Sequence, residues 1–165
     1  MKTGIFPLAE HERAEIAAHF LRLPPRDRHL RFGSGLSDHA IKNFVNSLNL
    51  SYLTGYFLGG QLAAVSFIAP EAPGKVEFAI SVDEKFRGVG IARRLLEYSI
   101  ETLSSGARPG IVIRHASENA PIARLCSKFD ASRMHEGPDV VATLDPWGSV
   151  QEVSRALELL CAAEG

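Results

Sequence analysis

The sequence predicts a single α+β domain in which helices flank a mixed, mostly antiparallel sheet. With 165 residues, 45% of them hydrophobic and 22% charged, the chain is long and apolar enough for one folded domain with a sizeable core. Two stretches of strand-forming residues surround Gly59-Gly60-Gln61, which is a typical hairpin signal. Helical and extended patterns alternate along the remainder, with no repeat or linker between them. These features favour one domain over residues 1–165.

The N-terminal third is predicted to contain one strand followed by two helices. Residues 10–23 carry apolar side chains at helical spacing and stop before Pro24-Pro25. Residues 26–35, which are basic and end in Gly-Ser-Gly, are expected to form a connection. Ser37 can cap a second helix, in which apolar residues recur at positions i, i+3, i+4 and i+7. They are Ile41, Phe44, Val45 and Leu48.

The remaining elements are strands and helices separated by glycine and proline. Residues 51–58, 62–69 and 75–82 are predicted to form a meander of three strands. After it we expect a helix at 90–103, a strand at 110–115, a helix at 119–129, strands at about 131–136 and 139–144, and a last helix at about 149–162. The predicted order is therefore β-α-α-β-β-β-α-β-α-β-β, with the C-terminal helix as an appendage.

Composition argues against several classes of function. A formal net charge of −1 gives no basic surface for nucleic acid, and no apolar run is long enough to span a bilayer. Charged residues soon follow Met1, so we expect no signal peptide. Cys126 and Cys161 form neither a disulfide framework nor a metal motif, and the six histidines lack ligand spacing. We therefore expect a cytoplasmic protein without metal, nucleic-acid or membrane partners.

Residues 76–96 are the most informative segment of the chain. They combine a strand, a turn rich in glycine and arginine, and the start of an amphipathic helix. Free backbone N–H groups at a helix start, with glycines that allow close approach, are typical of phosphate binding. Arg93 stands where the dinucleotide fingerprint needs Gly or Ala, and no Gly-Lys-Ser/Thr completes a Walker loop. The alternative is a plain turn that needs glycine for its backbone conformation.

The pattern Arg87-x-x-Gly90-x-Ala92 resembles the Gln/Arg-x-x-Gly-x-Gly/Ala signature of the GNAT superfamily of N-acetyltransferases. Residues 119–129 are similar to the family's helix after the fifth strand, and the element order agrees over nearly the whole chain. The resemblance implies transfer of the acetyl group of acetyl-coenzyme A (acetyl-CoA) to a primary amine of a small molecule or protein. The family often dimerises through its last strands, so the resemblance also raises a homodimer as one alternative.

The resemblance further implies which residues hold acetyl-CoA. The backbone N–H groups of the loop would bind its pyrophosphate, and those of the preceding strand would face the acetyl carbonyl. An asparagine that begins the helix after the fifth strand is often turned toward the cofactor. Carried over to this sequence, the residues are Ile80, Ser81, Val82, Arg87, Gly88, Val89, Gly90, Ile91, Ala92, Arg93 and Asn119.

Two residues are candidates for acid–base chemistry. Alternation places Glu77, Ala79 and Ser81 on one face of their strand, and some members of the family use a glutamate there as general base. Glu77 is therefore the candidate base, and the alternative is an ordinary solvated carboxylate. Cys126 stands where the family commonly has a tyrosine. Its thiol either protonates the leaving thiolate or packs along an apolar helical stripe.

The sequence leaves alternatives open at three points. The missing tyrosine permits a non-catalytic acyl-CoA-binding or regulatory domain instead of an enzyme, whereas the failed fingerprints disfavour another kind of nucleotide-binding domain. Residues 25–32 resemble a segment of family members that act on protein lysines or small amines, and a solvated basic loop explains them equally well. His115 and Glu118 lie at the end of the strand predicted at 110–115, just before the helix at 119–129, and are secondary catalytic candidates.

Overall fold

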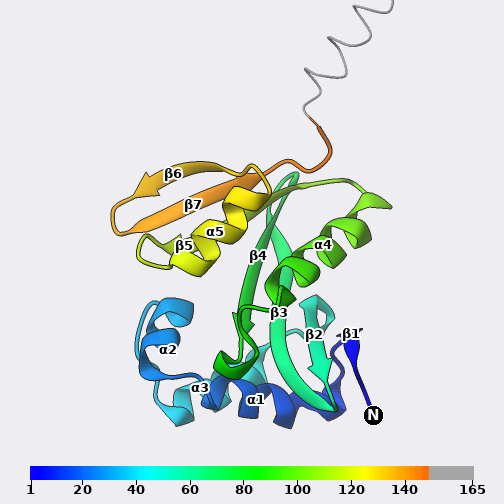
Figure 1. The fold of residues 1–165 in the computed structure, drawn as a ribbon, viewed down its shortest axis with the longest axis vertical. Helices are drawn as coiled ribbons and strands as arrows, with labels where there is room; N and C mark the ends of the chain where they lie inside the picture. The colour runs from blue at the N-terminus through cyan, green and yellow to red at the C-terminus, as the bar shows by residue number, and fades with distance from the viewer. Residues whose placement is uncertain (149–165) are drawn as a thin grey trace, which may run out of the picture.

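The computed structural model describes residues 1–148, which form a seven-stranded sheet with helices against both faces (Figure 1). The strand order is β1-β2-β3-β4-β5-β7-β6, and every neighbouring pair is antiparallel except β4–β5. The strands are β1 (Gly4–Pro7), β2 (Leu53–Leu58), β3 (Gln61–Ala72), β4 (Lys75–Val82), β5 (Gly110–Ala116), β6 (Ser132–Glu136) and β7 (Asp139–Leu144). The predicted fold class is confirmed. The helix expected at about 149–162 lies outside the described residues.

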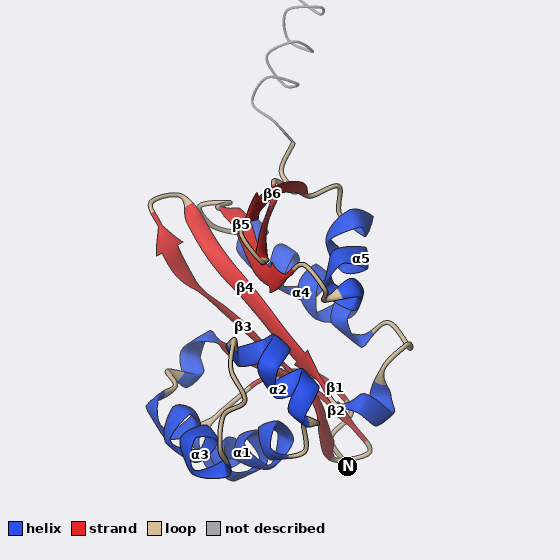
Figure 2. Cartoon of the chain, turned by 90° about the vertical axis from the view of Figure 1, so that its left-hand side faces the viewer, coloured by secondary structure: helices blue, strands red, loops and turns tan. Residues whose placement is uncertain are grey.

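The helices form two layers on opposite sides of the sheet (Figure 2). In the described part of the chain they are α1 (Arg13–Leu21), α2 (Pro25–Phe32), α3 (Asp38–Ser47), α4 (Ile91–Ser104) and α5 (Ala120–Lys128). α1 and α3 pack on β2 and β3, in a core that includes Phe20, Ile41 and Phe57. α4 and α5 pack on the other face, in a core around Phe78 and Leu96. Both faces of the sheet are therefore covered by apolar packing.

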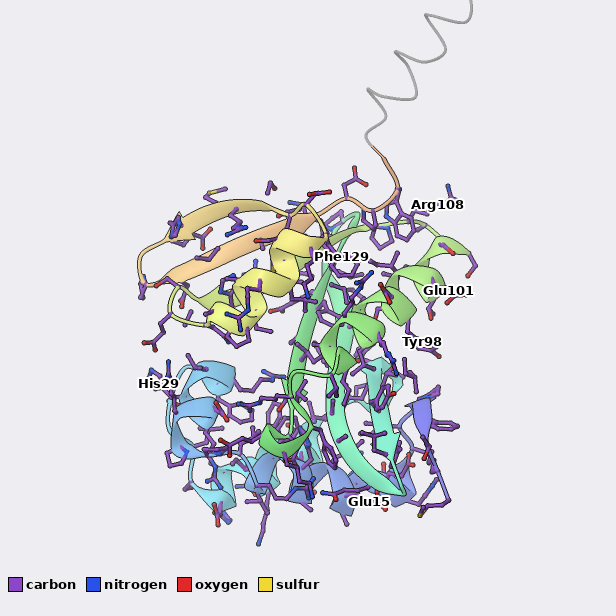
Figure 3. The ribbon with its side chains drawn as sticks, in the orientation of Figure 1. Glu15, His29, Tyr98, Glu101, Arg108 and Phe129 are labelled. Carbon is purple, nitrogen blue, oxygen red and sulfur yellow. The ribbon has the colours of Figure 1, made fainter. Side chains whose placement is uncertain are left out.

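The connection predicted over residues 26–35 is wrong, because Pro25–Phe32 form helix α2. Pro25 lies in the first turn, where its fixed φ suits a helix and its missing N–H costs no bond. Gly33 ends the helix with a φ of +71°. The helix is short and polar, so it lacks the apolar period that reveals a helix in sequence. Exposed side chains such as His29 project away from the protein (Figure 3).

The first predicted helix also differs from the observed structure. Residues 10–23 do not form one continuous helix: Glu10–Glu12 form a 3₁₀ turn, and α1 begins at Arg13. Lys2 pairs with the buried carboxylate of Glu12 across this turn, and the same carboxylate accepts a hydrogen bond from Ala9 N. The side chain of Glu12 therefore caps the chain ahead of α1 and changes how the helix starts.

The sheet divides between β4 and β5. These parallel strands pair at three positions only, from Lys75–Gly110 to Glu77–Val112. β4 then continues along β3 as far as Val82, while β5 continues along β7. Within the described residues, the backbone of β4 beyond Glu77 therefore has no strand partner on the side that faces β5. Backbone groups that are unpaired in this way are available to hydrogen-bond a ligand.

Candidate active site

The loop between β4 and α4 presents a group of exposed backbone amides. Gly88 and Gly90 have φ values of +76° and +83°, in the left-handed region that favours glycine. Gly90 is the N-cap of α4 and has no side chain to cap it, and the first bond of the helix runs from Arg94 N to Gly90 O. The amides of residues 91–93 consequently have no intrahelical acceptor. A Cβ built on either glycine would meet no atom within 4 Å, so the loop faces open space.

The charges around the loop favour an anion. The first turn of α4 has no acidic residue, and it contains Arg93 and Arg94. Arg94 Nη1 donates to the Tyr56 hydroxyl (2.9 Å), while Arg93 pairs with Glu97 at the surface (2.7 Å). A helix N-terminus with adjacent cations is a site of positive potential. The donors and charges of this loop therefore favour an anionic ligand.

Arg87 ties the loop to two neighbouring elements. Its Nε and Nη2 donate to Val82 O at the end of β4 (3.1 and 3.0 Å). Nη2 also donates to Asp27 Oδ2 on α2 (2.7 Å). The guanidinium is therefore already engaged by protein acceptors, and its evident role in the structure is to position the loop.

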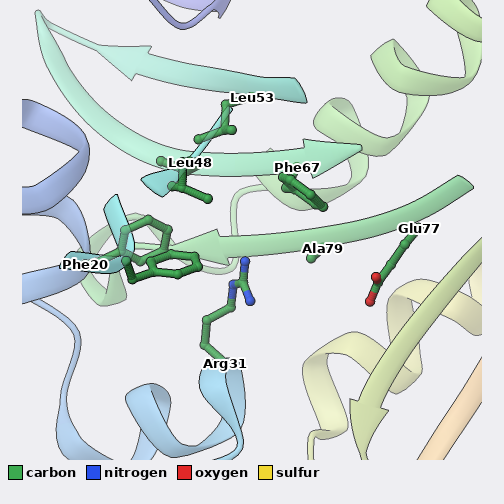
Figure 4. A pocket seen from close by; sticks show the side chains of 9 residues that line it. Phe20, Arg31, Leu48, Leu53, Phe67, Glu77 and Ala79 are labelled. Atoms are coloured by element: carbon green, nitrogen blue, oxygen red, sulfur yellow. The ribbon is translucent and has the colours of Figure 1, made fainter. Parts of the chain in front are cut away.

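A pocket of about 180 Å³ lies between the sheet and helices α1–α3 (Figure 4). Its charged lining residues are Arg31 from α2 and Glu77 from β4. The others are apolar, namely Phe20, Phe44, Leu48, Leu53, Val65, Phe67 and Ala79. The predicted alternation along β4 is confirmed here: Glu77 lines the pocket, whereas Phe78 is buried in the core on the other face.

Glu77 occupies the position at which β4 and β5 part, since its pairing with Val112 is the last between them. Its side chain is 37% exposed, and its one ion-pair contact among the described residues is to Arg114 Nη1, at 3.9 Å. Arg114 donates its hydrogen bond to Glu71 instead. The Glu77 carboxylate is therefore loosely held and accessible from the pocket, as a proton acceptor must be.

A buried polar network fixes the last residues of β4. His19 Nε2 lies 3.0 Å from Ser81 Oγ, and Arg22 Nε donates to Asp83 Oδ2 at 2.7 Å. Burial lowers the pKa of His19 from 6.5 to about 4, so the imidazole is neutral at pH 7. The side chain of Ser81 is thus engaged by α1. Its backbone, with that of Ile80, belongs to the part of β4 that β5 leaves unpaired.

The structure does not bring Cys126 to Glu77. Cys126 is a residue of α5 and is fully buried in the core between α5 and the sheet, on the opposite face of the sheet from the pocket. Burial raises the pKa of its thiol. These surroundings favour the packing alternative. Asn119 caps α5, because its Oδ1 accepts a hydrogen bond from Ile122 N (3.4 Å). His115 is also buried, and its Nδ1 lies 2.8 Å from Ala116 O.

No family model matches the chain, and no curated protein matches it in sequence. Solved structures do match. The GNAT domain of S. lividans PAT superposes with a TM-score of 0.74 at 14% identity, over 86% of this chain and 89% of that one. A GNAT-family acetyltransferase from Bacillus anthracis gives 0.71 at 12% identity, over 87% and 95%. The PaiA N-acetyltransferase from Thermoplasma acidophilum, solved in complex with coenzyme A, gives 0.68 at 13% identity, over 88% and 99%.

These superpositions establish the fold of the chain. The chain has the GNAT fold, and the recognition made from the loop and the element order is confirmed at that level. Within residues 1–148, none of the helices combines the length and apolarity that crossing a membrane requires. The same residues contain no group of three His, Cys, Asp or Glu side chains placed to hold a metal ion.

Proposed function

We propose that the protein is an N-acetyltransferase that moves the acetyl group of acetyl-CoA to the primary amine of a small acceptor. The observation that carries the proposal is the continuity of one site. The exposed amides at the start of α4, the unpaired edge of β4 and the carboxylate of Glu77 follow one another along residues 77–93. The GNAT fold supports it, and so does the coenzyme A complex of one structural neighbour.

Each part of this site has a chemical role in the proposal. The amides of residues 88–93 bind the pyrophosphate, because they are uncommitted donors at a helix N-terminus. Acetyl-CoA, when bound, supplies an acetyl thioester. Backbone N–H groups of Ile80–Val82 on the open edge of β4 polarise a carbonyl placed there. Glu77 accepts a proton from the acceptor's ammonium group, directly or through water, which leaves the amine able to form the new C–N bond. The C–S bond of the thioester breaks as that bond forms, and the coenzyme leaves as a thiolate that takes the second nitrogen proton through water.

The pocket beside Glu77 is the proposed acceptor site. Residues of α1, α2 and α3 line one side of it and its lining is mostly apolar, which favours a small amine or a single side chain over an extended polar ligand. Cys126 is assigned to packing, since its thiol is fully buried beneath the opposite face of the sheet.

A non-catalytic acyl-CoA-binding domain is the second candidate. The buried thiol of Cys126 favours it, because a residue in this environment is poorly placed to protonate a departing thiolate. A domain of this kind would bind acyl-CoA through the same loop at the start of α4 but would not catalyse acetyl transfer.

Release of free thiol from acetyl-CoA in the presence of a panel of amines tests both candidates. Thermal stabilisation by coenzyme A together with amine-dependent thiol release supports the enzyme. Stabilisation with no release on any amine supports the binding domain. Absence of stabilisation at millimolar coenzyme A contradicts both.

A further inference from the structure

Arg31 reaches the pocket from the last turn of α2 and forms no ion pair with any residue that the structure describes. Its guanidinium carbon lies 5.3 Å from the ring centre of Phe32 and 6.0 Å from that of Phe20. Its Nε is buried and has no hydrogen-bond partner among the described residues. A cation held out of water without an acceptor is costly, and an anion that binds beside the guanidinium would relieve that cost.

Rigid contacts hold α2, and therefore Arg31, in place. Asp27, one turn earlier on α2, pairs with Arg87 in the phosphate-binding loop. Arg28 donates to the carbonyl groups of Leu21, Leu23 and Leu36, which fixes the helix against its flanking segments. The position of Arg31 is therefore set by the fold, with its guanidinium presented to the pocket (Figure 4).

The two charges of the pocket are separate from each other. Burial lowers the pKa of the Arg31 guanidinium, and the attraction of Glu77 through space opposes this only in part. No ion pair joins the two side chains in the described part of the chain. Between and around them the lining is apolar, with three phenylalanine rings. A ligand that complements this lining carries a cation, an anion and an apolar group.

We propose that the acceptor is a small hydrophobic amino acid, whose carboxylate binds Arg31 while its ammonium group faces Glu77 and its side chain fills the apolar part of the pocket. A guanidinium presents donors in a planar fork that matches a carboxylate. The single cation in the described lining matches one negative charge. This inference rests on the proposed acetyl transfer and adds the substrate class.

The first test compares amines that differ only in the carboxylate. L-Phenylalanine is paired with phenethylamine, and L-leucine with isoamylamine. We expect the amino acid of each pair to have at least about a tenfold higher kcat/KM, because only its carboxylate can form a hydrogen-bonded charge pair with the guanidinium. Equal or better turnover of the decarboxylated amines overturns the inference and leaves the acetyl transfer intact.

Variants of α2 identify the group that recognises the carboxylate. In Arg31→Met the preference for the amino acid is lost through a higher KM, and Arg31→Lys restores part of it. Arg26→Met is the matched control, because Arg26 is an exposed arginine on the same helix. An unchanged preference in a folded Arg31→Met protein overturns the role of Arg31.

A binding measurement gives a readout that does not depend on turnover. Thermal stabilisation of the coenzyme A complex by L-phenylalanine should exceed that by phenethylamine in the wild type and in Arg26→Met, and the difference should vanish in Arg31→Met. If L-phenylalanine and L-leucine neither stabilise the complex nor become acetylated while other amines do, the inference fails and the proposed function stands. If coenzyme A itself fails to bind, the proposed function is contradicted, and the inference that rests on it is contradicted as well.

Discussion

Asp27 and Arg87 form a 2.7 Å ion pair that joins helix α2 to the loop at the start of α4. The same Arg87 nitrogen that contacts Asp27 also donates to Val82 O. One side chain therefore connects the end of β4, the proposed phosphate site and the helix that carries Arg31. This connection means that the loop sequence helps to shape the proposed acceptor pocket as well as the proposed cofactor site.

Removing this ion pair should affect the acceptor more than the cofactor. In Asp27→Asn, α2 loses its tie to the loop, and we expect the KM for the acceptor to rise about threefold, which matches the usual value of a partly exposed ion pair. Steady-state kinetics with each substrate varied in turn measures the effect. Glu10→Gln, which breaks the remote Glu10–Arg13 pair, is the control. Equal changes in the two variants would contradict the proposed link.

Replacing the proposed base should lower kcat without weakening cofactor binding. We expect Glu77→Gln to reduce kcat by about 10²-fold or more, because the amide cannot accept the proton. Glu71→Gln is a matched control, since Glu71 shares the Arg114 partner but does not line the pocket. An unchanged rate and pH profile in Glu77→Gln would remove Glu77 from the mechanism.

Cys126 should prove to be a packing residue. Cys126→Ala leaves a small cavity in a fully buried site, so we expect the free energy of unfolding to fall by about 1 kcal/mol. We expect kcat to stay within about twofold of the wild type. Chemical denaturation and thiol-release kinetics on the same preparation separate the two effects. A large loss of kcat in a protein of nearly normal stability would instead assign the thiol to proton transfer.

His19 should make the fold sensitive to mild acid. Its pKa is about 4 in the folded protein and 6.5 is its ordinary value, so the unfolded chain binds the proton first as the pH falls. Stability is therefore fully present above pH 6.5 and decreases toward pH 4, by up to about 3 kcal/mol. Asp83 and Glu12 have lowered pKa values and contribute only at the acid end of this range.

Denaturation curves between pH 7 and pH 4.5 measure this dependence. His19→Gln keeps a hydrogen-bonding side chain near Ser81 but does not titrate, so its stability should be nearly flat with pH. His29→Gln, which changes an exposed histidine, should keep the full slope. The explanation fails if the wild type and His19→Gln lose stability in parallel.

Local patterns were sufficient to predict the strands, the turn before α4 and the face of β4. The hairpin around Gly59-Gly60 and the helix that begins after Gly90 depend on neighbouring residues only. Glu77 could be placed beside the pocket because alternation along a strand is fixed by its geometry. Helix α2 was missed because its start and end are set by Pro25 and Gly33 rather than by an apolar period.

The parts of the site that could not be predicted depend on contacts between distant segments. His19 and Ser81 are 62 positions apart in the chain, and Asp27 and Arg87 are 60 apart. In the sequence, Arg31 is one of several basic residues in a segment that is expected to be a solvated connection. Only the packing of α2 beside Phe20 and across from Glu77 distinguishes it from its neighbours.

The position of the pyrophosphate can be tested with two glycine variants. Gly90 and Gly74 have φ values of +83° and +72°, and a Cβ on either would meet nothing within 4 Å. Alanine at each position therefore introduces similar backbone strain, about 1–2 kcal/mol, but only Gly90 belongs to the proposed phosphate loop. Gly90→Ala should weaken coenzyme A binding, whereas Gly74→Ala should leave it unchanged.

The most direct test of the proposed pyrophosphate site is calorimetric titration of the full chain with two ligands. They are coenzyme A and pantetheine, which lacks the pyrophosphate and the nucleotide. If the amides at the start of α4 hold the pyrophosphate, coenzyme A binds at least about tenfold more tightly than pantetheine, and Gly90→Ala removes most of that difference. Equal affinities for the two ligands in the wild type, or no binding of coenzyme A at all, would contradict this assignment.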